Sequence, residues 1–258
     1  MRHGGAPVFQ TPKVTPAVKI ILIALVAVFI LQLILDGALG NVTFTRLMGF
    51  IPYRFVNGYL WQIVTYAFLH GSPSHLFFNG FMLFMLGIQL ESFWGTRRFV
   101  KFFVATAIGG ALLHTLIWGL SFLFFPEQSE TLGMIPIIGA SGAVYGLFMA
   151  YAMLFGDTYF LAFFVFPIKA KYLVAIMGGM SLISSVFYSQ DGVAHLVHLG
   201  GLIAGFIYIK FNGPNLRGGG GGWPFRKKKS MTREEVRQRL SVITNEDFGD
   251  KGQPIRWN

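Results

Sequence analysis

The chain has 258 residues, of which 53% are hydrophobic and only 12% are charged, whereas about 25% of the residues of an ordinary soluble domain are charged. This composition excludes a simple soluble domain and predicts an all-α integral membrane protein. The sequence contains no cysteine, which excludes disulfides and thiolate chemistry. The net charge of +10 comes mostly from the C-terminal tail, and basic residues beside a membrane explain it without a nucleic-acid partner.

Six apolar segments are predicted to span the bilayer as helices, because about 20 apolar residues cover the hydrocarbon layer. They are residues 18–37, 75–95, 99–125, 139–156, 172–188 and 193–211. Lys and Arg gather before the first segment, in the loops after the second and the fourth, and after the sixth. The positive-inside rule therefore predicts that both termini are cytosolic. The segments make up one membrane domain, residues 18–211, which follows a cytosolic arm, residues 1–17.

Three regions outside these segments have their own patterns. Residues 38–74 are rich in aromatic side chains, so we expect this loop to be partly embedded in the outer leaflet. Residues 159–168 are too short to span and contain Pro167, which favours an interfacial approach to the fifth helix. Residues 212–258 are predicted to be a cytosolic tail with a glycine-rich linker, a basic cluster at 226–230 and a short helix opened by Thr232 and Glu235.

The positions of the acidic residues and histidines limit which protease mechanisms the predicted membrane segments can support. Every Asp lies at a helix end or in the tail and Glu91 lies near the inner end of the second segment, so no pair of buried carboxylates is expected, and no H-E-x-x-H helix is present. These absences argue against an aspartyl protease and a zinc protease, and they predict no metal ion and no cofactor.

The remaining polar residues of the spans gather near one surface. His75 and Asn79 lie four residues apart, on one face of the second segment. Ser141 begins the fourth segment, and His195 and His198 lie a few residues into the sixth. All three segments are predicted to run inward from the outside, so these polar groups share a depth close to the outer boundary.

Small residues predict that the fourth and sixth segments pack closely. Gly142 and Gly146 in the fourth segment, and Gly201 and Gly205 in the sixth, repeat at four-residue spacing. Because His198 shares a face with Gly201, this packing would present its imidazole to Ser141. Taken singly, such a serine can bond back to its own helix, and a histidine can join two helices. Their agreement in depth and side favours a common site.

These residues resemble the motifs of the rhomboid intramembrane serine proteases over residues 18–211. The G-x-S-G motif of that family appears as Gly139 to Gly142 around Ser141, and its H-x-x-x-N motif as His75 to Asn79. The remaining matches are His198 with Gly201 and Gly205 in H-x-x-G-x-x-x-G, Tyr145 after the serine, Glu91 with Gly95, and Trp61, which Gln62 follows where the family has arginine.

The resemblance implies a six-helix rhomboid-like bundle and a role for each matched residue. Ser141 would be the nucleophile and His198 the general base of a dyad, with Tyr145 stacked on the imidazole. His75, Asn79 and the Ser141 N–H would stabilise the oxyanion. The glycines at 139, 142, 201 and 205 would allow close approaches.

A transmembrane protein that unwinds near the outer surface would be the substrate, and a bacterial plasma membrane the location. The fifth helix, with Gly178 and Gly179, would be a mobile gate. Two other classes of protein are the alternatives. A non-catalytic member of the same fold would lack the serine or the histidine, and a small transporter would have its polar groups near the bilayer midplane.

Overall fold

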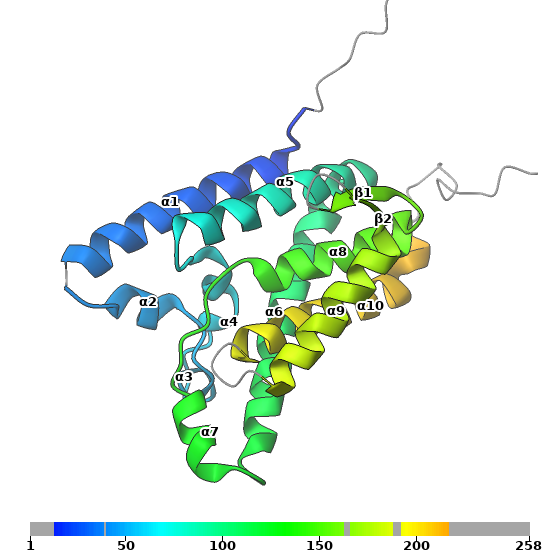
Figure 1. Cartoon of the computed structure of the whole chain (residues 1–258). Helices are drawn as coiled ribbons and strands as arrows, with labels where there is room; N and C mark the ends of the chain where they lie inside the picture. The colour runs from blue at the N-terminus through cyan, green and yellow to red at the C-terminus, as the bar shows by residue number, and fades with distance from the viewer. Residues whose placement is uncertain (1–12, 39, 163–165, 188–191, 217–258) are drawn as a thin grey trace, which may run out of the picture. The chain divides into compact units, whose positions relative to one another are not determined.

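The computed structural model describes residues 13–38, 40–162, 166–187 and 192–216 (Figure 1). In chain order they form α1 (Pro16–Ala38), α2 (Thr43–Met48), α3 (Pro52–Val56), α4 (Gln62–Thr65), the 3-10 helix η1 (Tyr66–Phe68), α5 (Pro73–Trp94), α6 (Thr96–Ser121), α7 (Pro126–Leu132), α8 (Ser141–Phe155), β1 (Tyr159–Ala162), β2 (Phe166–Lys169), α9 (Ala170–Phe187) and α10 (Gly192–Leu216). Most of the predicted arm and tail, including the basic cluster and the short helix opened by Thr232, lies outside the described residues.

Each of the six predicted apolar segments coincides with a helix, namely α1, α5, α6, α8, α9 and α10. Among the described residues, α1, α5 and α6 are long and apolar enough to cross a membrane. The helix α8 has only 15 residues, about 22 Å at 1.5 Å per residue, which is less than the hydrocarbon thickness of about 30 Å. It is shorter than the predicted segment because residues 139, 140 and 156 lie outside the helix. The crossing count of six stays a prediction.

The buried carboxylate of Glu91 joins three helices at one end of the fold. It accepts hydrogen bonds from the backbone N–H groups of Ala17 and Val18, both at 2.9 Å, in the first turn of α1. It also accepts one from the Thr96 hydroxyl at 2.6 Å, where α6 begins. Because the first N–H groups of a helix have no partner within the helix, this carboxylate satisfies two of them and fixes α1 against α5 and α6.

Glycines bring the backbones of α8 and α10 together. A Cβ added at Gly201 would overlap the carbonyl group of Gly142, and one at Gly205 would lie 3.0 Å from the carbonyl oxygen of Gly146. Only small residues permit helices to approach this closely. The predicted close packing of these two segments is therefore present, and α10 also packs against α6 and α9 (Figure 1).

Residues 40–72 fold into short helices that hydrogen bonds from side chains to the backbone hold together. The fully buried Gln62 accepts from the Ile51 N–H at 3.1 Å and donates to the carbonyl oxygens of Arg46 and Leu47 at 3.2 and 3.1 Å. The Trp61 indole also donates to Leu47, at 3.0 Å. These bonds close the C-terminal end of α2, which is too short to satisfy its own carbonyl groups.

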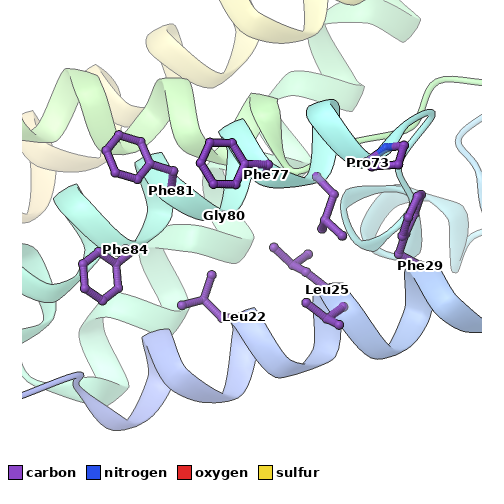
Figure 2. Close-up of a pocket in the computed structure, with 10 residues that line it drawn as sticks. Leu22, Leu25, Phe29, Pro73, Phe77, Gly80, Phe81 and Phe84 are labelled. Carbon is purple, nitrogen blue, oxygen red and sulfur yellow. The ribbon is translucent and has the colours of Figure 1, made fainter. Parts of the chain in front are cut away.

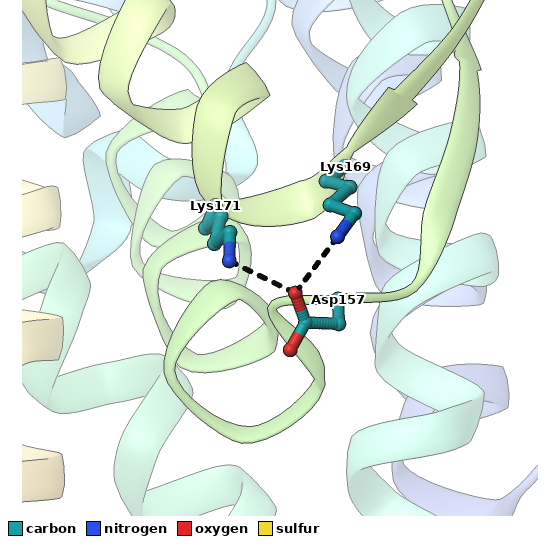
Figure 3. A network of polar contacts seen from close by, with 3 residues as sticks. All are labelled: Asp157, Lys169 and Lys171. Carbon is teal, nitrogen blue, oxygen red and sulfur yellow. Dashed lines mark hydrogen bonds and ion pairs between the residues drawn. The ribbon is translucent and has the colours of Figure 1, made fainter.

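The interfacial segment predicted at residues 159–168 forms an antiparallel hairpin, so the all-α prediction is wrong at this point. Tyr159 pairs with Lys169 and Leu161 with Pro167. Aromatic and β-branched residues favour strands. Proline has no backbone N–H to donate, and it is tolerated at a sheet edge because no second strand needs that donor. Beside the hairpin, Asp157 binds the ammonium groups of both Lys169 and Lys171, at 3.3 and 2.9 Å (Figure 3).

The C-terminal end of α10 also differs from the prediction. The helix continues to Leu216 instead of giving way to a linker at residue 212. The Asn212 amide donates to the Tyr208 carbonyl oxygen one turn earlier, at 3.0 Å, which keeps this polar residue within the helical pattern.

The helix α5 presents two different faces. One face borders an apolar groove of about 380 Å³ between α1 and α5 (Figure 2). It contributes Phe77, Gly80, Phe81 and Phe84, opposite Leu22, Leu25, Val26 and Phe29 of α1. His75 and Asn79 lie on the opposite face, because they are offset from the groove residues by about half a helical turn. His75 and Asn79 therefore face away from the groove.

Candidate active site

Ser141 begins α8 directly after a segment that the loop of residues 40–72 holds in place. Phe50 and Ile137 exchange two backbone hydrogen bonds, of 2.9 and 2.8 Å. The Gly139 N–H donates to the Tyr66 carbonyl oxygen at 2.9 Å. Gly139 has a φ of +126°, a backbone conformation that favours glycine. This turn lets the chain enter α8 with Ser141 at its first position.

His198 of α10 meets Ser141 across the close glycine contact between the two helices. Its Nε2 lies 2.8 Å from the Ser141 Oγ, so the two groups are hydrogen-bonded. The Tyr145 ring stacks on the imidazole, with centroids 4.2 Å apart and planes inclined by 6°. Stacking and the serine contact together fix both the plane and the direction of the His198 ring.

His75 approaches the same point from α5. A Cβ added at Gly139 would lie 2.8 Å from Cε1 and Nε2 of the His75 ring, so glycine is the residue that leaves room for it. The Nδ1 of His75 accepts from the Gly71 N–H at 3.4 Å, which leaves Nε2 as the ring nitrogen beside Gly139. The structure thus brings three predicted site residues, on α5, α8 and α10, to one place.

Asn79 and His195 take less direct positions. The Asn79 amide donates to the His75 carbonyl oxygen at 3.0 Å, within α5, and this bond uses one of its two N–H groups. The His195 ring lies 5.8 Å from the His198 ring and edge-on to it, whereas the hydrogen bond to Ser141 comes from His198. No group of three metal-ligating side chains occurs in the part of the chain that the structure describes.

His70, which no sequence motif marks as a site residue, also lies beside the site. It is 1% exposed, and its ring lies 5.0 Å from the His75 ring in an edge-on contact. Burial, and to a smaller extent the neighbouring His75, lower the pKa of His70 to about 4. His70 lies in an aromatic loop, and its neighbours in the sequence form no motif that would distinguish it from an ordinary loop histidine.

Tyr66 is another residue of this region that no sequence motif marks. It is fully buried, its hydroxyl donates to the Ala107 carbonyl oxygen of α6 at 2.7 Å, and its carbonyl oxygen receives the Gly139 N–H. Burial raises its pKa, so the hydroxyl stays a neutral donor. One residue therefore links the loop of residues 40–72, α6 and the turn before Ser141.

The rhomboid domain family matches residues 57–214, more than half of the chain, and the match contains all the predicted site residues. The chain belongs to the rhomboid family. The resemblance seen in the sequence is thus confirmed at the level of the family. Membership places the protein in a family of membrane-embedded proteins.

Relatives of the rhomboid family come from bacteria and eukaryotes. The chain is 27% identical to Rhomboid protease GluP of Bacillus subtilis over 80% of its own length and 36% of that protein. It is 29% identical to Rhomboid protein 1, mitochondrial, of Saccharomyces cerevisiae over 57% of its length and 40% of that protein. It is 28% identical to Rhomboid-like protein 19 of Arabidopsis thaliana over 64% of its length and 52% of that protein. The chain spans about a third to a half of the length of these relatives.

Proposed function

We propose that the protein is an intramembrane serine endopeptidase that hydrolyses peptide bonds of transmembrane proteins. The observation that supports this most directly is the 2.8 Å contact between the Ser141 Oγ and the His198 Nε2, made by residues 57 positions apart. Two other observations agree with it. The chain belongs to the rhomboid family, and its relatives include a protein named as a rhomboid protease.

In this proposal Ser141 and His198 act as a dyad. The Ser141 Oγ attacks the scissile carbonyl carbon while its proton passes to Nε2 of His198. His198 then gives that proton to the leaving amide nitrogen, and the substrate's carbonyl side stays bound to Ser141 as an ester. Water hydrolyses the ester with the same histidine as base. Tyr145 takes the orienting part that a carboxylate has in a triad, because its ring fixes the imidazole plane.

The oxyanion formed in each addition step needs donors. We propose that His75, whose ring adjoins Gly139, and the backbone N–H of Ser141 supply them, with the free N–H of Asn79 as a further donor. Gly142, where a Cβ would lie 2.9 Å from the Val197 side chain, acts with Gly201 and Gly205 to keep α10 close enough for His198 to act.

The proposed setting is a plasma membrane, of bacterial origin, crossed by all six long helices with both termini cytosolic. The site then lies near the outer surface, at the outer ends of α5, α8 and α10. A substrate helix must unwind there before its carbonyl groups can be attacked, because a helix keeps them hydrogen-bonded. The helix α9 is the proposed gate, and crosslinking it to α5 without loss of cleavage would contradict that part.

The test is cleavage of a single-span model substrate in liposomes by the wild type and two variants. We expect the wild type to cut, and Ser141→Ala and His198→Ala to fall below about one thousandth of its rate, because the two residues act as a unit. Mass spectrometry of the products locates the cut bond relative to the membrane boundary.

A matched control is His195→Ala, on the same helix one turn before His198 and without the bond to Ser141. It should keep most of the activity. Cleavage by Ser141→Ala at the wild-type rate would contradict the serine-protease proposal. Failure of the wild type on several substrates would favour a non-catalytic member of the family.

A further inference from the structure

One polar residue in the apolar helix α1 has no part in the dyad. Gln32 lies in the sequence "VFILQLILDG", and its side chain is buried, 7% exposed. A buried amide without partners would cost several kcal/mol in an apolar environment. Polar residues within membrane helices are therefore usually engaged by specific partners.

Gln32 uses both ends of its amide. Its Oε1 accepts a hydrogen bond from the backbone N–H of His70 at 3.1 Å, across 38 positions of sequence. Its Nε2 donates to the Thr45 hydroxyl at 2.9 Å. That hydroxyl in turn donates to the carboxylate of Asp36 at 2.6 Å, one turn along α1 from Gln32. A buried polar chain thus runs from α1 through α2 to the peptide of His70.

The far end of this chain lies against the site. The His70 ring contacts the His75 ring at 5.0 Å, and His75 in turn borders Gly139, two residues before Ser141. Neither ring nitrogen of His70 makes a hydrogen bond of ordinary geometry among the described residues, although the Phe68 backbone lies near enough to interact with the ring. The well-formed polar contact of His70 is therefore the one that its backbone N–H makes with Gln32.

We propose that Gln32 is a positioning residue that holds the His75 imidazole beside Gly139 by fixing the peptide of His70. The inference rests on the proposed function, because it assigns His75 to the stabilisation of the oxyanion. It predicts that a substitution of Gln32, which reaches the site only through His70 and His75, slows the chemical step and leaves substrate binding unchanged.

The first test compares kcat and KM of the wild type and Gln32→Leu, which has a similar volume and no amide. We expect kcat to fall about 10- to 100-fold with KM unchanged, because a misplacement of about 1 Å near the reacting groups costs this much. Thr45→Val breaks the chain at its middle and keeps the bond between Gln32 and His70, so its loss should be smaller. Leu33→Ala, at an exposed neighbouring position of α1, should match the wild type.

The conservative variant Gln32→Glu separates positioning from a general loss of stability. A protonated glutamate can accept from the His70 N–H and donate to Thr45, as the amide does, whereas an ionised one has no proton to donate and adds a charge near Asp36. The activity of this variant relative to the wild type at the same pH should therefore rise as the pH is lowered from about 8 to about 6, since burial raises the pKa of a carboxyl group.

The second test does not depend on cleavage. Imidazole nitrogen NMR spectra of Ser141→Ala, with and without Gln32→Leu, should show a shifted His75 signal when the amide is removed. The proposal would be overturned by an unchanged His75 signal, by a kcat equal to that of the wild type, or by a rise in KM alone. If the wild type cuts no substrate, the proposed function fails, but the spectra still decide whether Gln32 positions His75.

Discussion

The two sides of the candidate site are held in place in different ways. On one side, Ser141 and His198 meet because glycines let α8 and α10 touch, with Gly201 against the backbone of Gly142. On the other side, His75 lies against His70 of a loop whose buried polar side chains, among them Gln62, bind backbone groups. We therefore expect the first side to be sensitive to larger side chains at its glycines. We expect the second side to be sensitive to the removal of hydrogen-bonding side chains.

The difference follows from the local structure. Long helices satisfy their own backbone groups, so what remains to be specified is how closely they approach, and small residues decide that. The helices of residues 40–72 have three to six residues and leave many carbonyl and N–H groups unpaired. Because such groups cannot stay unpaired in an apolar environment, side chains must bind them.

The largest effect should come from adding one methyl group between the helices. In Gly201→Ala the new Cβ would overlap the Gly142 carbonyl group, so α10 must move away and His198 with it. We expect activity to fall at least about 100-fold and the free energy of unfolding to fall by about 1–3 kcal/mol. Cleavage assays and thermal unfolding in detergent measure the two effects.

The control for this prediction is Gly119→Ala. A Cβ at Gly119 would meet no atom within 4 Å, although the residue also lies in a long apolar helix. Near-wild-type activity in both variants would show that the glycine contact does not set the distance between Ser141 and His198.

A second prediction concerns acid on the polar side. Because the pKa of His70 is lowered from 6.5 to about 4 in the folded protein, the unfolded chain binds more protons between these values. The free energy of unfolding should therefore be highest above pH 6.5 and fall by up to about 3 kcal/mol as the pH drops toward 4. Thermal unfolding against pH measures this, and His70→Gln, which cannot titrate, should flatten the slope. Parallel slopes would contradict the assignment to His70.

The third prediction removes a partner from the same loop. Gln62→Leu keeps the volume but leaves the Ile51 N–H unpaired, and it removes one of the two donors to each of the Arg46 and Leu47 carbonyl oxygens, which keep Arg54 and Trp61 respectively. We expect a loss of about 1–3 kcal/mol of stability, the usual cost of unpaired buried groups. In Trp61→Phe, at an exposed position that makes a single such bond, the loss should be smaller. A larger loss for Trp61→Phe would mean that ring packing, and not hydrogen bonding, holds the loop.

The sequence predicts the side of the site formed by Ser141 and His198 better than the side formed by His75 and its loop. The contact of Ser141 with His198 could be anticipated because each residue lies beside glycines at helical spacing, and that spacing is visible in a short string. The bond between Gln32 and the His70 backbone joins residues 38 positions apart. No local pattern encodes it, and backbone acceptors and donors have no signature in the sequence.

The errors of boundary have physical causes as well. The length of the segment at residues 159–168 shows that it is too short to span. Whether such an aromatic segment forms a strand depends on its tertiary surroundings, which the sequence does not show. The short helices of residues 40–72 lie in a segment whose aromatic content indicated only embedding, and no prediction covered α7. Gln62 stands where the family has arginine, and the sequence predicted no structural role for it. Its burial and its three backbone contacts came from the structure alone.

The smallest effect is expected where polar groups meet in solvent. Asp157 binds two lysines, and their hydrogen bonds and charges lower its pKa, so its contribution exists at neutral pH and disappears when acid protonates the carboxylate. Its side chain is nevertheless 70% exposed, and water and salt screen such pairs. Asp157→Asn should therefore leave both the melting temperature and cleavage unchanged within error, at low and at physiological salt. A loss as large as that of Gln62→Leu would show that the hairpin, and not only the buried polar loop, depends on paired polar groups.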